Sequence, residues 1–204
     1  MATPTEHRFR GVVMPTSSHP AIRRERRRGA NPEIHGNKLW KSSMVLIDYL
    51  NREREPRPQS VIDVGCGWGI AGIWCAREFG ADVTSVDADA NVFPFLDVTA
   101  QLNGVSTHHR VSRFESLSTR ELESYDTLIA ADICFWDELV APVSNLVNRA
   151  IKAGVKRIII ADPERPTFHE MAERCLERHG GELLSWRTRG ARSASGALLV
   201  IDNR

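Results

Sequence analysis

The segment Val61–Gly69 constrains the fold of this chain more than any other. It reads VIDVGCGWG, so an apolar strand runs into a turn with Gly65, Gly67 and Gly69 at alternate positions. Glycines this close together disfavour helix and strand, by roughly 0.5–1 kcal/mol each relative to alanine. They suit a turn that needs positive φ angles and lets a ligand approach the backbone. A strand that enters such a turn before a helix is typical of α/β sheets that bind nucleotides.

Strand and helix patterns alternate along most of the chain. Expected strands are 60–64, 82–86, 109–111, 126–131, 157–161, 183–188 and 197–202, and expected helices are 38–50, 69–79, 90–102, 137–153 and 167–178. This alternation predicts parallel strands with right-handed crossovers. No helix separates the last two strands, so they must pair antiparallel. We therefore predict an α/β, Rossmann-like fold with a seven-stranded, mostly parallel sheet, a C-terminal antiparallel hairpin and helices on both faces.

The composition is that of an ordinary globular domain. The 204 residues are 42% hydrophobic and 26% charged, and they suffice for one core. The four cysteines and seven histidines show neither CxxC nor HExxH spacing, so we expect no disulfide framework and no metal site. The first ten residues lack the apolar core of a signal peptide, and no apolar run has the length of a membrane span. These features predict a cytoplasmic protein without membrane association.

The first 36 residues differ from the rest. They hold four prolines among polar and basic residues without a sustained period, which predicts an irregular basic arm at 1–36 and a folded domain at 37–204. Within the arm, Ile22–Arg28 reads IRRERRR. Such a run is typical of a solvated, mobile arm, or of an electrostatic footprint for nucleic acid or an acidic protein. The net charge of +1 and the lack of interleaved aromatics favour the mobile arm.

The glycine turn indicates which cofactor to expect. Dinucleotide sites carry GxGxxG, but the sixth position counted from Gly65 is Ile70. A GxGxG turn with an acid two positions before it, here Asp63, indicates S-adenosylmethionine (SAM). Asp63 is placed to hold the cationic methionine end, directly or through water. Asp87 ends the second expected strand, where it is placed either to accept bonds from both ribose hydroxyls or to cap the next helix.

Three further segments resemble the seven-β-strand protein methyltransferases of family 16, which includes many lysine methyltransferases. Residues 39–50 are similar to the family's tryptophan-containing helix, and residues 132–135 (DICF) are similar to its (Asp/Glu)-x-x-(Tyr/Phe) motif. Residues 161–165 (ADPER) resemble the GDPGR segment of electron-transfer flavoprotein β-subunit lysine methyltransferases. The resemblance covers about Asn37 to Phe168. The departures leave the acceptor open: lysine follows Trp40 where the family has proline, and Ala161 and Glu164 replace two glycines.

The resemblance implies roles for particular residues. Asp132 would orient an acceptor amine beside the transferable methyl group, and Phe135 would supply an apolar wall that lowers the amine pKa by desolvation. Trp40 would border the cofactor, and Phe114 and Glu115 would contact its adenine. Structural roles remain open for all five: a helix cap for Asp132, core packing for Phe135 and Trp40, and a surface turn for residues 114–115.

The resemblance favours N-methylation of a protein lysine, and three other functions stay open. Nucleic-acid amino-methyltransferases carry (Asn/Asp)-Pro-Pro-(Tyr/Phe/Trp) at the same strand end, whereas residues 132–135 lack both prolines. The same core also serves small-molecule amines. A SAM-binding scaffold without turnover would keep Asp63, the glycine turn and Asp87 but lose the chemistry.

Overall fold

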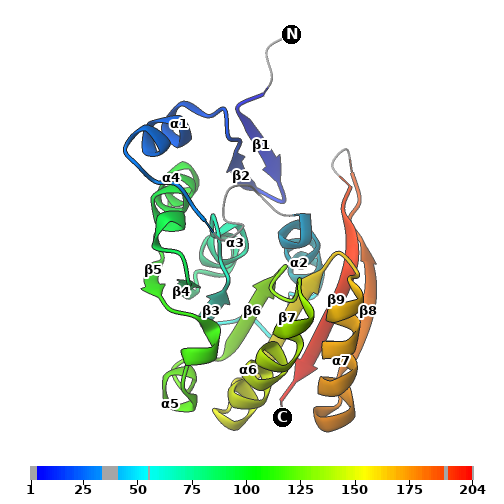
Figure 1. Ribbon diagram of the computed structural model, residues 1–204. Coiled ribbons are helices and arrows are strands. Elements are labelled where there is room, and N and C mark those ends of the chain that lie inside the picture. The colour runs from blue at the N-terminus through cyan, green and yellow to red at the C-terminus, as the bar shows by residue number, and fades with distance from the viewer. Residues whose placement is uncertain (1–3, 34–40, 55, 191–192, 204) are drawn as a thin grey trace.

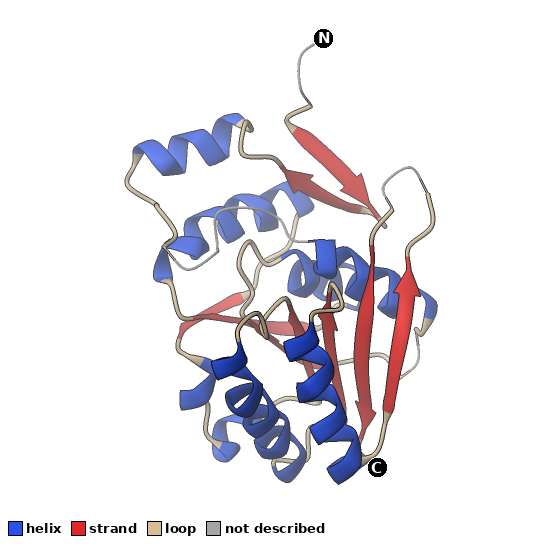
Figure 2. Cartoon of the chain, turned by 45° about the vertical axis from the view of Figure 1, so that its right-hand side comes forward, coloured by secondary structure: helices blue, strands red, loops and turns tan. Residues whose placement is uncertain are grey.

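A seven-stranded sheet forms the centre of the molecule, with helices on both faces (Figures 1 and 2). The structure is a computed structural model that describes residues 4–33, 41–54, 56–190 and 193–203. The strands of the central sheet, in spatial order, are β5 (His108–Val111), β4 (Asp82–Asp87), β3 (Ser60–Val64), β6 (Thr127–Ala131), β7 (Arg157–Asp162), β9 (Ser195–Asp202) and β8 (Glu182–Arg187). All neighbours pair in parallel except β9, which runs antiparallel to both β7 and β8. The predicted fold class is therefore confirmed.

The helices lie close to their predicted positions. They are α2 (Lys41–Arg52), α3 (Ile70–Phe79), α4 (Phe93–Asn103), α5 (Thr119–Leu122), α6 (Val140–Lys152) and α7 (Pro166–His179), with short 3₁₀ turns η1 (Ala90–Val92), η2 (Phe114–Ser116) and η3 (Asp137–Leu139). Gly80 and Gly104 end α3 and α4 in the left-handed conformation, as is common after helices. The short α5 was not predicted. None of the described helices has both the length and the apolarity to cross a membrane.

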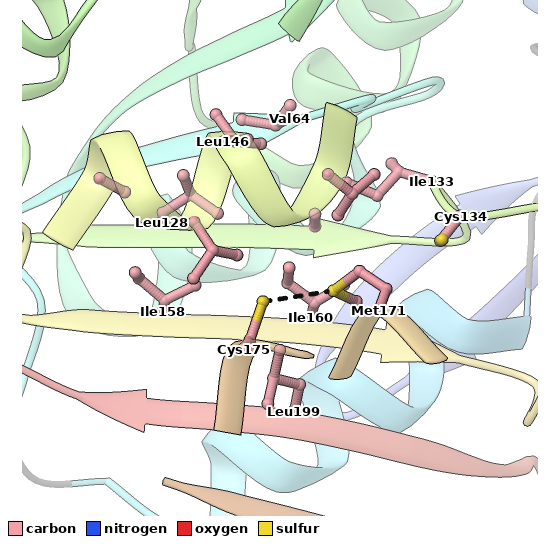
Figure 3. Close-up of a cluster of buried hydrophobic side chains, with 14 of the residues drawn as sticks. Val64, Leu128, Ile133, Cys134, Leu146, Ile158, Ile160, Met171, Cys175 and Leu199 are labelled. Atoms are coloured by element: carbon pink, nitrogen blue, oxygen red, sulfur yellow. Dashed lines mark hydrogen bonds between the residues drawn. The ribbon is translucent and has the colours of Figure 1, made fainter. Parts of the chain in front are cut away.

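The side chains of the strands alternate between two hydrophobic clusters. On one face, Leu128, Ile158 and Ile160 pack with residues of α6 and α7 (Figure 3). On the other face, Ile129 and Ile159 pack with residues of α2 and α3. Because both faces are covered, the central strands are apolar throughout, which is typical of parallel sheets. The sheet is therefore held rigid, and its carboxyl edge is a stable support for the loops that leave it.

Residues 4–33 are ordered, so the expectation of an irregular arm is wrong for the described part of this segment. β1 (Glu6–Phe9) and β2 (Val12–Pro15) form an antiparallel hairpin, and α1 (Pro20–Arg27) follows. The Asn103 side chain accepts a hydrogen bond from the Val13 N–H and donates one to the Val13 carbonyl, both at 2.8 Å. The Trp74 indole N–H donates to the Arg10 carbonyl at 3.0 Å. The predicted boundary between residues 36 and 37 lies outside the described residues.

Helix α1 packs on the glycine turn. Its Ile22 is fully buried in a cluster with Trp68 of the turn and Phe95 of α4. The rings of Trp68 and Phe95 stack with their centroids 5.3 Å apart, and the Arg26 guanidinium lies 6.0 Å from the Phe95 ring centroid. The interpretation of the arginine run as a mobile arm is therefore wrong, because one apolar face anchors the helix.

Candidate active site

The glycine turn between β3 and α3 adopts the predicted positive φ angles. They are 67° at Gly65, 52° at Gly67 and 70° at Gly69. A Cβ on Gly65 would lie 2.5 Å from Ile133 Cγ2, and one on Gly69 would lie 2.6 Å from Leu96 Cγ. A Cβ on Gly67 would have no atom within 4 Å. Gly65 and Gly69 therefore make room for the protein's own side chains, whereas the Gly67 backbone faces open space that a ligand can approach.

Asp63 is buried beneath this turn, next to the start of α3. Its Oδ2 accepts a hydrogen bond from the Gly72 N–H at 3.0 Å, and a Cβ on Gly72 would lie 2.9 Å from the same oxygen. Burial raises the pKa of Asp63 to about 7, and the charge of Asp87 adds to the rise. No donor within the described residues reaches the second oxygen, Oδ1. A cationic group placed there would offset the desolvation of the carboxylate, so the site fits the ammonium end of a SAM molecule.

Asp87 is the last residue of β4 and reaches back to the glycine turn. Its Oδ2 accepts from the Gly67 N–H and its Oδ1 from the Asp89 N–H, both at 3.0 Å. Asp89, not Asp87, caps η1 by accepting from the Asn91 N–H at 2.9 Å. Burial raises the pKa of Asp87. The Ala88 N–H also stabilises the ionised carboxylate. A carboxylate offers about four acceptor positions, so a position remains for a hydroxyl donor beside Gly67.

Asp132 takes part in an ion-pair cluster at the carboxyl ends of β6 and β7. The Nη1 of Arg165 donates to Asp132 Oδ1 at 2.6 Å and to Asp162 Oδ2 at 2.7 Å. The Arg165 backbone N–H donates to Asp162 Oδ1 at 2.8 Å. The sequence analysis missed Arg165 as a site residue, although it noted the segment 161–165. The signal was the Asp162-to-Arg165 spacing, but the link to Asp132 appears only once β6 and β7 are neighbours.

The backbone at Asp132 is strained. Its φ is +61°, in the left-handed region, which costs a non-glycine residue about 1–2 kcal/mol. A backbone hydrogen bond from its N–H to the Ala161 carbonyl, 2.9 Å, and the ion pair with Arg165 hold this conformation. Within the described residues, Asp132 caps no helix, since Trp136 stands at the cap of η3. Strain of this kind clusters at functional sites, which favours a functional interpretation of Asp132 over a capping role.

The loop 132–135 lies between the glycine turn and α7. Ile133 occupies the space left by Gly65, and the Cys134 carbonyl accepts from the Thr167 hydroxyl at 2.6 Å. Phe135 is half-buried, and its ring meets Trp136 edge-on with centroids 4.6 Å apart. Trp136 is 55% exposed. Phe135 and Trp136 are thus partly exposed at the surface.

The remaining predicted cofactor residues stay predictions. Phe114 and Glu115 form η2 after β5, where Arg149 donates to the Phe114 carbonyl at 2.8 Å. The Phe114 ring packs against the core, and Glu115 pairs with Arg113 at 3.1 Å. The predicted contact of Trp40 falls outside the described residues. The structure therefore brings Asp63, Asp87 and the glycine turn together with the loop 132–135, and places η2 at the end of a neighbouring strand.

The topology and the glycine turn define a class I SAM-dependent methyltransferase fold. A solved SAM-dependent methyltransferase from Agrobacterium tumefaciens superposes with a TM-score of 0.65 at 16% identity, covering 100% of this chain and 72% of that one. A family model described as lysine methyltransferase matches residues 27–178. The chain belongs to this family, and the family's cofactor is SAM. The predictions of family, fold and cofactor are confirmed.

Curated relatives differ in the acceptor that their names give. The electron transfer flavoprotein beta subunit lysine methyltransferase of Rattus norvegicus is 24% identical over 130 residues, 63% of this chain and 50% of that protein. A ubiquinone biosynthesis O-methyltransferase of Xanthomonas axonopodis pv. citri (strain 306) is 29% identical over 89 residues, 44% of this chain and 37% of that protein. The matched regions thus span half or less of these two relatives, and their names disagree on whether nitrogen or oxygen is methylated.

Proposed function

We propose that this protein is a SAM-dependent N-methyltransferase whose acceptor is the side-chain amine of a protein lysine. The observation that carries the proposal is the loop 132–135, which contacts the glycine turn through Ile133 and Gly65. This loop presents a carboxylate and an aromatic ring next to the cofactor turn. The family model and the name of the rat relative also support a lysine acceptor.

Different residues around the glycine turn bind different parts of the cofactor. Asp63 takes the ammonium end, Asp87 takes the ribose hydroxyls, and Gly67 allows a close approach to the backbone. Gly65 and Gly69 shape the turn, while Trp40, Phe114 and Glu115 remain predicted contacts. When bound, the cofactor supplies an electrophilic methyl group on its sulfonium sulfur. In-line transfer depends mostly on positioning.

The acceptor amine must be neutral to attack. A lysine with a pKa near 10.4 pays roughly 4–5 kcal/mol to lose its proton at pH 7. Phe135 and Trp136 lower that cost because they desolvate the ammonium form. Asp132 orients the amine through a hydrogen bond. Its own charge would favour the ammonium form, but the Arg165 guanidinium at 2.6 Å offsets that charge. Arg165 is therefore a positioning residue.

The test compares Asp132→Asn with the exposed Asp137→Asn of the same region as a matched control. With SAM saturating and total cell protein as the acceptor pool, single-turnover methyl transfer falls by about 10²-fold in Asp132→Asn, typical of lost positioning and proton handling. SAM affinity stays near that of the wild type. A correctly folded, fully active Asp132→Asn protein ends the catalytic assignment.

Phe135→Leu tests the apolar wall. The variant keeps cofactor binding. Its activity appears at higher pH, because the smaller side chain desolvates the ammonium less and therefore lowers the pKa of the acceptor lysine less. An unchanged pH profile with only a loss of stability would assign Phe135 to packing alone.

A further inference from the structure

Helix α1 carries a groove that the proposed chemistry does not use. The groove measures about 440 Å³ and is lined by Ser17, Ser18, Arg23, Arg26 and Arg27; we name it the arginine groove. Its wall includes the exposed guanidinium groups of Arg23 and Arg27, which are hydrogen-bond donors. Such a lining is suited to an anion.

The charges on α1 are sorted between two faces. The three groove arginines are spaced i, i+3 and i+4 and so share one side of the helix. The other two, Arg24 and Arg28, lie 3.3 and 3.2 Å from the Glu25 carboxylate. Glu25 thus partly neutralises the charge of Arg24 and Arg28, whereas Arg23 and Arg27 are exposed in the arginine groove.

Helix α1, which carries the groove, packs against the cofactor turn. Ile22 of α1 packs with Trp68 of the turn, and the Glu33 N–H after the helix donates to Asp89 Oδ2 at 2.6 Å. Figure 1 shows α1 and the N-terminal hairpin at the end of the molecule toward which the parallel strands run. A chain held in the groove therefore lies toward the same end of the molecule as the loop 132–135.

We propose that the arginine groove binds an acidic segment of the protein substrate while a lysine of that substrate enters the site at Asp132. This inference rests on the proposed function. Guanidinium groups pair with carboxylates in bidentate geometry. The run of arginines lies in one short helix of a chain with a net charge of +1, which suits a short acidic segment. Single-stranded nucleic acid also needs stacking platforms, and the only exposed large aromatic among the described residues, Trp136, is not part of the groove.

The experiment measures binding of a short fluorescein-labelled oligoglutamate to the SAM-saturated protein by fluorescence anisotropy. Arg23→Gln/Arg27→Gln empties the groove of two cations, and Arg24→Gln/Arg28→Gln removes two cations from the other face. Both double variants lose the same net charge, so general electrostatics affects them alike. An oligouridylate of equal charge is titrated in parallel, and thermal melting verifies that both variants fold.

Oligoglutamate affinity should fall about tenfold in the groove variant, as expected for two partly exposed ion pairs, and less than threefold in the control. Equal losses in the two variants, or no binding to the wild type, would overturn the proposal. Oligouridylate binding as tight as that of oligoglutamate would overturn it in favour of nucleic acid. The readout needs no methyl transfer, so a failure of the groove and a failure of the lysine assignment are seen separately.

Discussion

Replacing Asp63 with asparagine should stabilise the protein, and by an amount that depends on pH. Burial raises the pKa of Asp63 from 3.8 to about 7, a rise of about three units, each equivalent to about 1.4 kcal/mol. Because the folded protein binds this proton more tightly than the unfolded chain, the associated stability is complete below about pH 4 and is lost as pH rises to about 7. Above that, ionised Asp63 costs the wild type up to about 4 kcal/mol.

Urea denaturation of both proteins across this pH range measures the effect. The advantage of Asp63→Asn should grow by about 1.4 kcal/mol per pH unit between about pH 4 and 7 and then level off. Asp137→Asn, at an exposed position, is the matched control for the loss of one carboxylate. The same Asp63→Asn protein should bind SAM about tenfold or more weakly, since a charged hydrogen bond is lost. A stability difference that does not change with pH would refute the burial argument.

Two further predictions concern contacts that the structure revealed. Asn103→Ala should lower the free energy of unfolding by about 2–4 kcal/mol, because it leaves the buried Val13 N–H and carbonyl without partners. Asn91→Ala, at an exposed position, is the control and should have little effect. An Asn103→Ala protein as stable as the wild type would mean that the hairpin is not anchored there. Arg165→Met should cost about 3 kcal/mol by leaving the buried Asp162 carboxylate uncompensated. The loss should be larger at pH 8 than at pH 5, because burial already raises the pKa of Asp162 and its ionised form is the one that needs Arg165; equal losses at both pH values would contradict this.

The central sheet was predictable because its signals are local. The central strands β3, β6 and β7 are mostly apolar runs, and glycines end α3 and α4 in the left-handed conformation. The N-terminal hairpin was not predictable in this way. Its two-residue loop needs positive φ at both positions, and Gly11 at 87° satisfies this readily, but Arg10 at 45° gives no such signal. Each of its strands is only four residues long, and the hairpin is held in place by hydrogen bonds to residues far away in the sequence, such as Asn103.

The site was predictable in part for similar reasons. Asp63 lies one residue before the end of β3, and Asp87 ends β4, so their proximity follows from the parallel pairing of these strands. The sequence did not decide which residue caps the helix after β4, and the structure assigns the cap of η1 to Asp89. Arg165 was missed because its two partners, Asp132 and Asp162, follow or end different strands. One side chain can reach both only because β6 and β7 are paired.

The central claim, methyl transfer to protein lysine, is tested most directly by one labelling measurement. The purified protein is incubated with methyl-labelled SAM and a cell extract lacking the enzyme, and the product is divided between protease and nuclease digestion. The account predicts that protease releases the label, that nuclease does not, and that acid hydrolysis yields methyl-lysine. Label that is released by nuclease, or that is found in small molecules alone, would contradict it.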